Sequence, residues 1–172
     1  MIAPLSLSNL LTVVFALVCL HTVAVQSRGT VVKLWRLAIP PAFAAVNAFS
    51  LLAGVFDASM MHDAEWLIAA AVGLVLGRTR GWTIELAVDQ QHELLRQRRA
   101  PDAVLVAIVL LLLSVTDFLG AALLEPVVEP PYVAAGAAFC AAYLAGRALA
   151  MAVRSTRLPH VELQGGRESV SG

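Results

Sequence analysis

The sequence predicts an all-α membrane protein with five transmembrane helices and a small cytoplasmic β-hairpin between the third and the fourth. Three observations support this fold class. Hydrophobic residues make up 59% of the chain and charged residues only 14%, which is unusual for a soluble domain. The apolar residues are gathered into long runs, and nearly all basic residues fall in alternate loops between those runs.

Four of the apolar runs are long enough to cross a bilayer. Each has about 19 to 22 residues, and at a rise of about 1.5 Å per residue that length spans a hydrocarbon core of about 30 Å. The runs cover residues 7–25, 37–56, 103–124 and 132–153. No basic residue precedes the first run, and several follow it. We therefore expect a retained span there rather than a cleaved signal peptide.

A shorter apolar run supplies the third predicted span. Only Trp66 to Gly77 is uninterrupted. Extending the span towards Trp82 puts a tryptophan near each end and allows Arg78 and Arg80 to reach one interface. We predict a span over about residues 63–80, which makes five crossings.

The basic residues predict the orientation. Eleven of the twelve lysines and arginines follow the first, third and fifth spans, whereas the loops at 57–65 and 125–131 carry only acidic charges. Because basic residues accumulate on the cytoplasmic side, the amino terminus is expected outside and the carboxyl terminus inside. This alternation requires an odd number of spans. Residues 1–158 then form the helical bundle, and residues 159–172, which lack periodicity, form a disordered cytoplasmic tail.

The polar passage at residues 82–99 has two readings. Trp82, Ile84, Leu86 and Val88 alternate with more polar residues, as in a half-buried strand that a second strand could follow after a turn. The same passage is rich in good helix formers and also fits one amphipathic helical face. It lacks the glycine that tight hairpins prefer, so the residues alone leave both readings open.

A resemblance favours the hairpin. The segment "GLVLGRTRGWTIELAVD", the later "LLRQRRAP" and the earlier "VVKLWRLAIPP" are similar to the CcdC-like group of small bacterial integral membrane proteins, over roughly residues 31–120. The resemblance implies a bacterial inner-membrane location and a hairpin after the third span. The chain departs from the group's pattern at the turn, where Gln90 and Gln91 stand in place of the usual glycine. The group takes its name from an association with cytochrome c maturation, and the resemblance implies no catalytic residue or ligand.

Four polar residues inside the predicted spans are candidate functional residues, because a polar group in hydrocarbon is costly. Asp117 and Arg147 are estimated to differ in depth by roughly 8 Å in antiparallel helices. They form a pair, or else Arg147 extends to the interface while Asp117 is protonated or meets a hydroxyl such as that of Thr116. His21 and Asn47 are expected to hydrogen-bond to neighbouring helices. Haem needs a second intramembrane histidine, so no cofactor is predicted.

Small residues recur at a spacing of four in two spans and predict close helix packing, within one bundle or in a homodimer. The residues that we assign to this packing are Gly73, Gly77, Gly81, Ala142 and Gly146. Cys19 and Cys140 are single cysteines without a redox motif, so we expect buried apolar side chains, with a thiol-redox pair as the alternative.

The arginines of the central polar passage predict a cytoplasmic basic face. Its members are Arg78, Arg80, Arg96, Arg98 and Arg99. Because all lie close to the membrane, anionic lipid headgroups are the expected partner. Nucleic acid is not expected, and neither a metal site nor a catalytic motif is visible.

These features predict a non-enzymatic accessory or scaffold protein of the inner membrane, whose partner is the bilayer, a second copy or another membrane protein. One alternative is a small proton-linked transporter that uses Asp117 and Arg147. Another is a membrane thiol-redox component, related to cytochrome c maturation, that uses Cys19 and Cys140.

Overall fold

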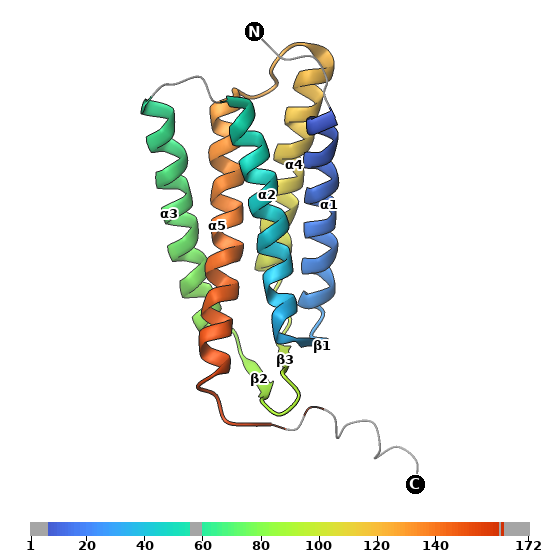
Figure 1. Ribbon diagram of the computed structural model, residues 1–172, viewed down its shortest axis with the longest axis vertical. Coiled ribbons are helices and arrows are strands. Elements are labelled where there is room, and N and C mark those ends of the chain that lie inside the picture. The colour runs from blue at the N-terminus through green and yellow to red at the C-terminus, as the bar shows by residue number, and fades with distance from the viewer. Residues whose placement is uncertain (1–6, 56–59, 162, 164–172) are drawn as a thin grey trace.

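Five helices and a small three-stranded sheet make up the computed structural model, which describes residues 7–55, 60–161 and 163. The helices are α1 (Leu7–Ser27), α2 (Ile39–Val55), α3 (Met60–Thr83), α4 (Asp102–Leu123) and α5 (Pro130–Ser155). They run alternately up and down, so that α1 begins at one end of the molecule and α5 finishes at the other (Figure 1). The sheet lies at the end where α1, α3 and α5 finish.

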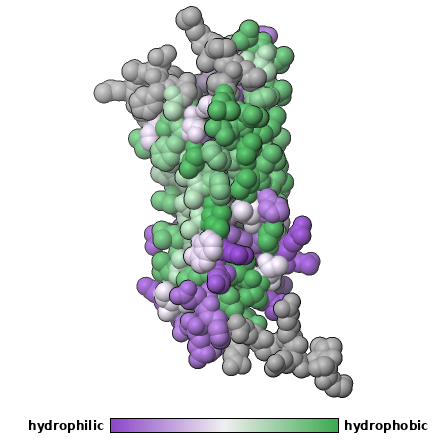
Figure 2. Space-filling model, turned by 45° about the vertical axis from the view of Figure 1, so that its right-hand side comes forward, coloured by the Kyte–Doolittle hydropathy of each residue, from purple (hydrophilic) through white to green (hydrophobic). Residues whose placement is uncertain are grey.

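Four of the helices are long and apolar enough to cross a membrane. The qualifying segments are Leu7–Ser27, Leu34–Ala53, Asp102–Leu123 and Pro130–Ser155. Large apolar side chains on them remain exposed, among them Leu10, Leu17 and Leu112. Figure 2 shows the resulting apolar surface along the helices, with hydrophilic residues gathered at the sheet end. This surface is that of a multi-pass membrane protein, since lipid rather than water is the partner of such side chains.

The third helix is not among these four, and it is longer than predicted. Its 24 residues begin at Met60 and continue through Thr83, beyond both ends of the predicted span at 63–80. The described part of the predicted loop at 57–65 is therefore helical from Met60 onward, and Trp82 belongs to the helix rather than to a strand. The helix finishes where the Arg154 Nη1 group donates hydrogen bonds to the carbonyl oxygens of Gly81 and Ile84, at 2.8 and 2.6 Å, which satisfies carbonyls that a helix end leaves without partners.

Four of the helices form a common core, and the fifth packs at its periphery. The helices α1, α2, α4 and α5 surround one buried cluster of small and apolar side chains that includes Ala16, Ala44, Leu110 and Ala137. The remaining helix, α3, packs mainly along α5 and lies at the edge of the molecule (Figure 1).

The predicted hairpin is present but shorter than residues 82–99, and a third strand joins it. Strand β2 (Leu86–Asp89) pairs antiparallel with β3 (Leu94–Gln97), which also pairs antiparallel with β1 (Val31–Lys33). The order β1-β3-β2 joins the two polar loops of the sheet end in one sheet. A 3-10 helix, η1 (Leu34–Ala38), leads from β1 into α2.

An aspartate side chain replaces glycine in the turn of the hairpin. The Asp89 Oδ1 atom accepts hydrogen bonds from the backbone amides of Gln91 and His92 at 3.1 and 3.2 Å. Such side-chain bonds stabilise turns without glycine. Within this turn, Glu93 adopts the left-handed backbone conformation, with a φ of 53°.

The sheet is attached to the bundle by a second apolar cluster. Leu95 and Val88 of the sheet are buried there against Leu37, Ile84 and Met151. Met151 can take part because α5 continues to Ser155, past the level at which α4 begins. The sheet is therefore packed under the helices as part of one core, and is not a free loop.

Candidate functional site

A buried network of charged and polar side chains lies where the helices meet the sheet. Arg147 on α5 is only 5% exposed. Its Nε atom lies 3.3 Å from the Asp102 Oδ2 atom, and its Nη2 group donates to the Gln97 Oε1 atom at 3.2 Å. The Tyr143 hydroxyl donates to the same Asp102 oxygen at 2.9 Å, and the Arg80 Nε atom lies 3.6 Å from the other oxygen. The network joins α3, α4, α5 and β3.

Gln97 extends this network to the first helix. Its side chain is 1% exposed, and its Nε2 group donates to the carbonyl oxygen of Gln26 at 2.7 Å. The Gln26 side chain in turn donates to the carbonyl oxygen of Arg36 at 2.7 Å. Through these two glutamines, the buried charge of Arg147 is connected to α1 and η1. All five helices or their immediate extensions therefore share one polar junction.

The predicted alternative of an Asp117–Arg147 pair is not what the structure contains. Asp102 is the acidic partner of Arg147, and it lies fifteen residues, or about 22 Å of helix, from Asp117 on α4. The depth estimate of roughly 8 Å failed because α5 runs past the start of α4, which places Arg147 level with Asp102. Asp102 was missed because an acidic residue at a helix start already has an ordinary explanation in the helix dipole.

The other intramembrane candidates lie apart from this network. Asp117 accepts a hydrogen bond from the Asn9 Nδ2 group at 2.9 Å, near the opposite end of the bundle. Asn47 is fully buried and donates to the Thr12 carbonyl oxygen at 2.8 Å and to the Ser114 hydroxyl at 3.0 Å. It thereby connects α1, α2 and α4. His21 is exposed on α1.

The two cysteines are buried in the same apolar cluster. Cys19 is 0% and Cys140 1% exposed. The Cys19 thiol donates to the carbonyl oxygen of Pro40 at 3.5 Å. Both sulfurs are therefore shielded from reagents in water, as expected of structural rather than reactive cysteines.

The predicted packing glycines bring α3 and α5 into backbone contact. A Cβ atom added at Gly73 or Gly77 would collide with the carbonyl group of Phe139 or Tyr143, and one added at Gly146 would collide with that of Leu74. At Gly81 the added atom would lie 2.7 Å from the Ala150 Cβ atom and the Arg147 carbonyl oxygen. The small residues of α3 and those of α5 thus pack against each other within one chain. Ala142 lines an apolar groove of about 200 Å³ between α2, α3 and α5.

The predicted basic face divides into residues with different neighbours. Arg80 approaches Asp102, as described above, and Arg78 is exposed on α3. The Arg98 Nη1 group lies 3.1 Å from the Glu85 Oε2 atom, and both side chains are 74% exposed. Arg96 and Arg99 are exposed and have no acidic partner among the residues that the structure describes.

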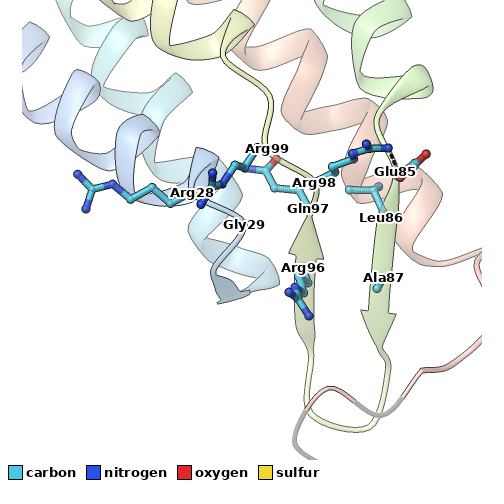
Figure 3. Close-up of a pocket in the computed structure, with 9 residues that line it drawn as sticks. All are labelled: Arg28, Gly29, Glu85, Leu86, Ala87, Arg96, Gln97, Arg98 and Arg99. Atoms are coloured by element: carbon cyan, nitrogen blue, oxygen red, sulfur yellow. Dashed lines mark hydrogen bonds and ion pairs between the residues drawn. The ribbon is translucent and has the colours of Figure 1, made fainter. Parts of the chain in front are cut away.

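A polar pocket of about 520 Å³ is formed around Arg96 and Arg99. It lies between the end of α1, β2 and β3 (Figure 3). Four arginines and a single carboxylate are among its lining residues, which are Arg28, Gly29, Glu85, Leu86, Ala87, Arg96, Gln97, Arg98 and Arg99. Arg28 comes from the loop after α1, so the pocket collects basic residues from two loops that are far apart in the sequence.

A third polar cluster surrounds Asp89. Burial alone would raise the pKa of Asp89, but hydrogen bonds from the side chain and backbone of His92 outweigh that effect and hold the pKa below its usual value. The His160 Nδ1 atom lies 3.6 Å from the Asp89 Oδ1 atom. Val161 donates its amide to the Val88 carbonyl oxygen at 2.9 Å. The first described residues of the predicted tail at 159–172 therefore lie along β2.

Comparison with protein-family models, curated proteins and solved structures finds no match. The resemblance to the CcdC-like group therefore remains a prediction from the residues.

Proposed function

We propose that this chain is a non-enzymatic accessory or scaffold protein of the bacterial inner membrane, with five crossings, an outer amino terminus and the sheet in the cytoplasm. The support for this orientation is the charge distribution. Hydrophilic surface gathers at the sheet end, where α1, α3 and α5 finish (Figures 1 and 2). Basic residues that follow these helices, such as Arg28, Arg99 and Arg157, belong to this end. Basic residues near the ends of spans accumulate on the cytoplasmic side.

The fifth crossing is assigned to α3. Its 24 residues are about 36 Å long, which is enough to span the hydrocarbon core. Leu67, Ile68, Val72 and Val75 are each about half exposed or more, and lipid would cover these side chains. An even number of crossings would place α4 and α5 in orientations that contradict the distribution of basic residues.

The observation that carries the scaffold proposal is the use that the bundle makes of its polar side chains. Asn47 connects three helices, Asp117 holds the start of α1, and Arg147 joins α5 to α4 and to the sheet. Each polar group thus fastens one element to another. Such contacts stabilise a fixed arrangement of helices, which is what a scaffold requires.

The two alternative functions have less support. A proton-linked carrier was predicted to use Asp117 and Arg147 together, but these residues lie about 22 Å apart along the bundle. A thiol-redox component needs a thiol that its partner can reach, and both cysteines are buried.

The orientation is tested with single cysteines placed at the two ends of the molecule. In a variant without the native cysteines, Gln91→Cys lies in the exposed turn of the hairpin and Glu129→Cys in the exposed segment before α5. A membrane-impermeant maleimide added to intact spheroplasts should label Glu129→Cys alone. Labelling of Gln91→Cys alone, or of both, would overturn the topology.

The scaffold role is separated from the carrier role by Asp117→Asn. The amide preserves a hydrogen-bonding group for Asn9 but cannot carry a proton. In a deletion strain the variant should restore the wild-type phenotype. In proteoliposomes with a pH-sensitive dye, both forms should leave proton flux at the level of empty vesicles. Proton flux that the wild type supports and Asp117→Asn abolishes would establish the carrier instead.

A further inference from the structure

The polar pocket at the sheet end carries an excess of uncompensated positive charge. Arg98 is paired with Glu85, and the latter is the single acidic residue of the pocket lining. No acidic group pairs with Arg28, Arg96 or Arg99 within the part of the chain that the structure describes. Figure 3 shows Arg98 turned towards Glu85, whereas the other three guanidinium groups point away from it. The pocket therefore presents free donors and positive charge to an anion.

The arginines of this pocket come from two separate loops. Gly29 adopts a φ of +80°, a conformation that side chains disfavour, and this turn reverses the chain directly after α1. A Cβ atom at Gly29 would lie 3.5 Å from the Gln97 carbonyl oxygen and 4.0 Å from the Arg99 Cγ atom. The reversal then leads into β1, where Val31 is paired with Arg96. Arg28 is thus brought into the lining of the same pocket as Arg96 and Arg99.

The position of the pocket along the helices matches the level of lipid headgroups. Arg28 comes directly after α1, and Arg99 lies three residues before α4. These two helices pack side by side. Val25 and Leu105 lie within one turn of these helix ends and are 40% and 61% exposed. Apolar surface for acyl chains therefore begins next to the charged pocket.

We propose that this pocket is a binding site for an anionic phospholipid, whose phosphate contacts the three unpaired arginines while its acyl chains lie along α1 and α4. The planar guanidinium fork matches phosphate oxygens and binds them through two hydrogen bonds at once. A phospholipid is favoured over free phosphate because apolar surface adjoins the pocket. The site rests on the proposed function, since it requires the sheet end to lie at a membrane surface.

The proposal is tested by native mass spectrometry of the purified chain in neutral detergent, titrated with phosphatidylglycerol or phosphatidylcholine. The wild type should bind one phosphatidylglycerol in preference to phosphatidylcholine. Arg96→Gln with Arg99→Gln should weaken phosphatidylglycerol binding about 25-fold, since each basic residue near anionic lipid contributes a factor of about five. The matched control, Arg36→Gln with Arg157→Gln, removes two exposed arginines outside both the pocket and the predicted basic face and should bind as the wild type does. Equal weakening in both double variants would overturn the site.

A substitution with the opposite effect keeps the test decisive even if the double variant is unstable. Glu85→Gln removes the acidic group from an exposed position and releases Arg98, so it should tighten phosphatidylglycerol binding several-fold. Unchanged or weaker binding would contradict the proposal.

Competition with inorganic phosphate distinguishes a phospholipid site from a site for free phosphate. Millimolar phosphate should not displace phosphatidylglycerol, because it lacks acyl chains. Displacement by phosphate would assign the pocket to a free anion and overturn the lipid site. Because these measurements are made in detergent, they do not depend on membrane orientation. Loss of lipid preference with correct cysteine labelling would refute this inference alone, whereas reversed labelling would refute the proposed function.

Discussion

Replacing Arg147 with methionine should destabilise the protein by about 3 kcal/mol. Removing one partner of a buried ion pair costs about 3–5 kcal/mol, because the other charge is left without compensation. The lower end of that range applies here. The Asp102 side chain is 19% exposed, still accepts the Tyr143 hydrogen bond and still has Arg80 at 3.6 Å.

The double variant separates a lost charge pair from a lost packing contact. In Arg147→Met with Asp102→Asn, no buried charge is left unpaired, since the Arg80 side chain, which loses its partner, is 47% exposed. The amide oxygen still accepts a hydrogen bond from Tyr143. We therefore expect the double variant to lie within about 1.5 kcal/mol of the wild type and above the Arg147→Met single variant. The stability is measured by titrating micelles with sodium dodecyl sulfate and following the helical circular dichroism.

An exposed arginine provides the control. Arg78→Met removes a charge from the surface of α3 and should change the free energy of unfolding by less than about 0.5 kcal/mol. If Arg147→Met behaved like this control, or if the two substitutions of the double variant were simply additive, the ion pair would not be what holds this junction together.

Three further outcomes are expected. Gly77→Ala should destabilise the bundle by about 1–3 kcal/mol in the same titration, because its Cβ atom collides with the backbone of α5. Gly120→Ala, where the nearest atom would lie 3.5 Å away, should have little effect, and equal effects would refute the close approach. The pKa of Asp89 is lowered in the folded state, so its stabilising contribution is fully present above the ordinary carboxyl pKa of about 3.9 and is lost as the pH falls from there through the lowered pKa of the folded state. Protection of the turn amides from hydrogen exchange, measured by NMR, should follow that course in the wild type and should not depend on pH in Asp89→Asn, whose side-chain oxygen still accepts but does not titrate. Wild-type protection that persisted through acidification, or an equal loss in Asp89→Asn, would contradict it. Cys19 and Cys140 should react with maleimide only after denaturation, and rapid labelling in native membranes would reopen the redox alternative.

Hydropathy and charge placement predict the helices because both depend on local composition. The runs at 7–25, 103–124 and 132–153 fall within α1, α4 and α5 to within a few residues. The small residues of α3 and α5 likewise predict a close helix contact, because only residues without a large side chain allow it. Their spacing does not say whether the partner is in the same chain, and the structure places it there.

The parts that were not predicted depend on contacts between distant residues. Strand β1 has only three residues, too few for an alternating pattern to be recognised. The residues alone did not decide between a hairpin and a helix, because the turn has no glycine. It is stabilised instead by the Asp89 side chain, which accepts hydrogen bonds from the turn amides. Asp102 was not identified as the partner of Arg147, because the two are level only when α5 extends past the start of α4. That extension depends on the packing of α5 against the sheet and not on the composition of α5.

The arrangement in which α3 packs mainly along α5 has a consequence for biosynthesis. The ribosome completes α3 two helices before its principal neighbour. The glycine row of α3 therefore has no α5 backbone to pack against until the last helix has been translated. The four-helix core also closes only when α5 arrives, since that helix contributes to both contacts. Completion of α5 is thus the step that commits the chain to its final arrangement. Truncation before residue 130 would leave α3 without its principal neighbour, and α2 and α4 without the contacts that α5 supplies.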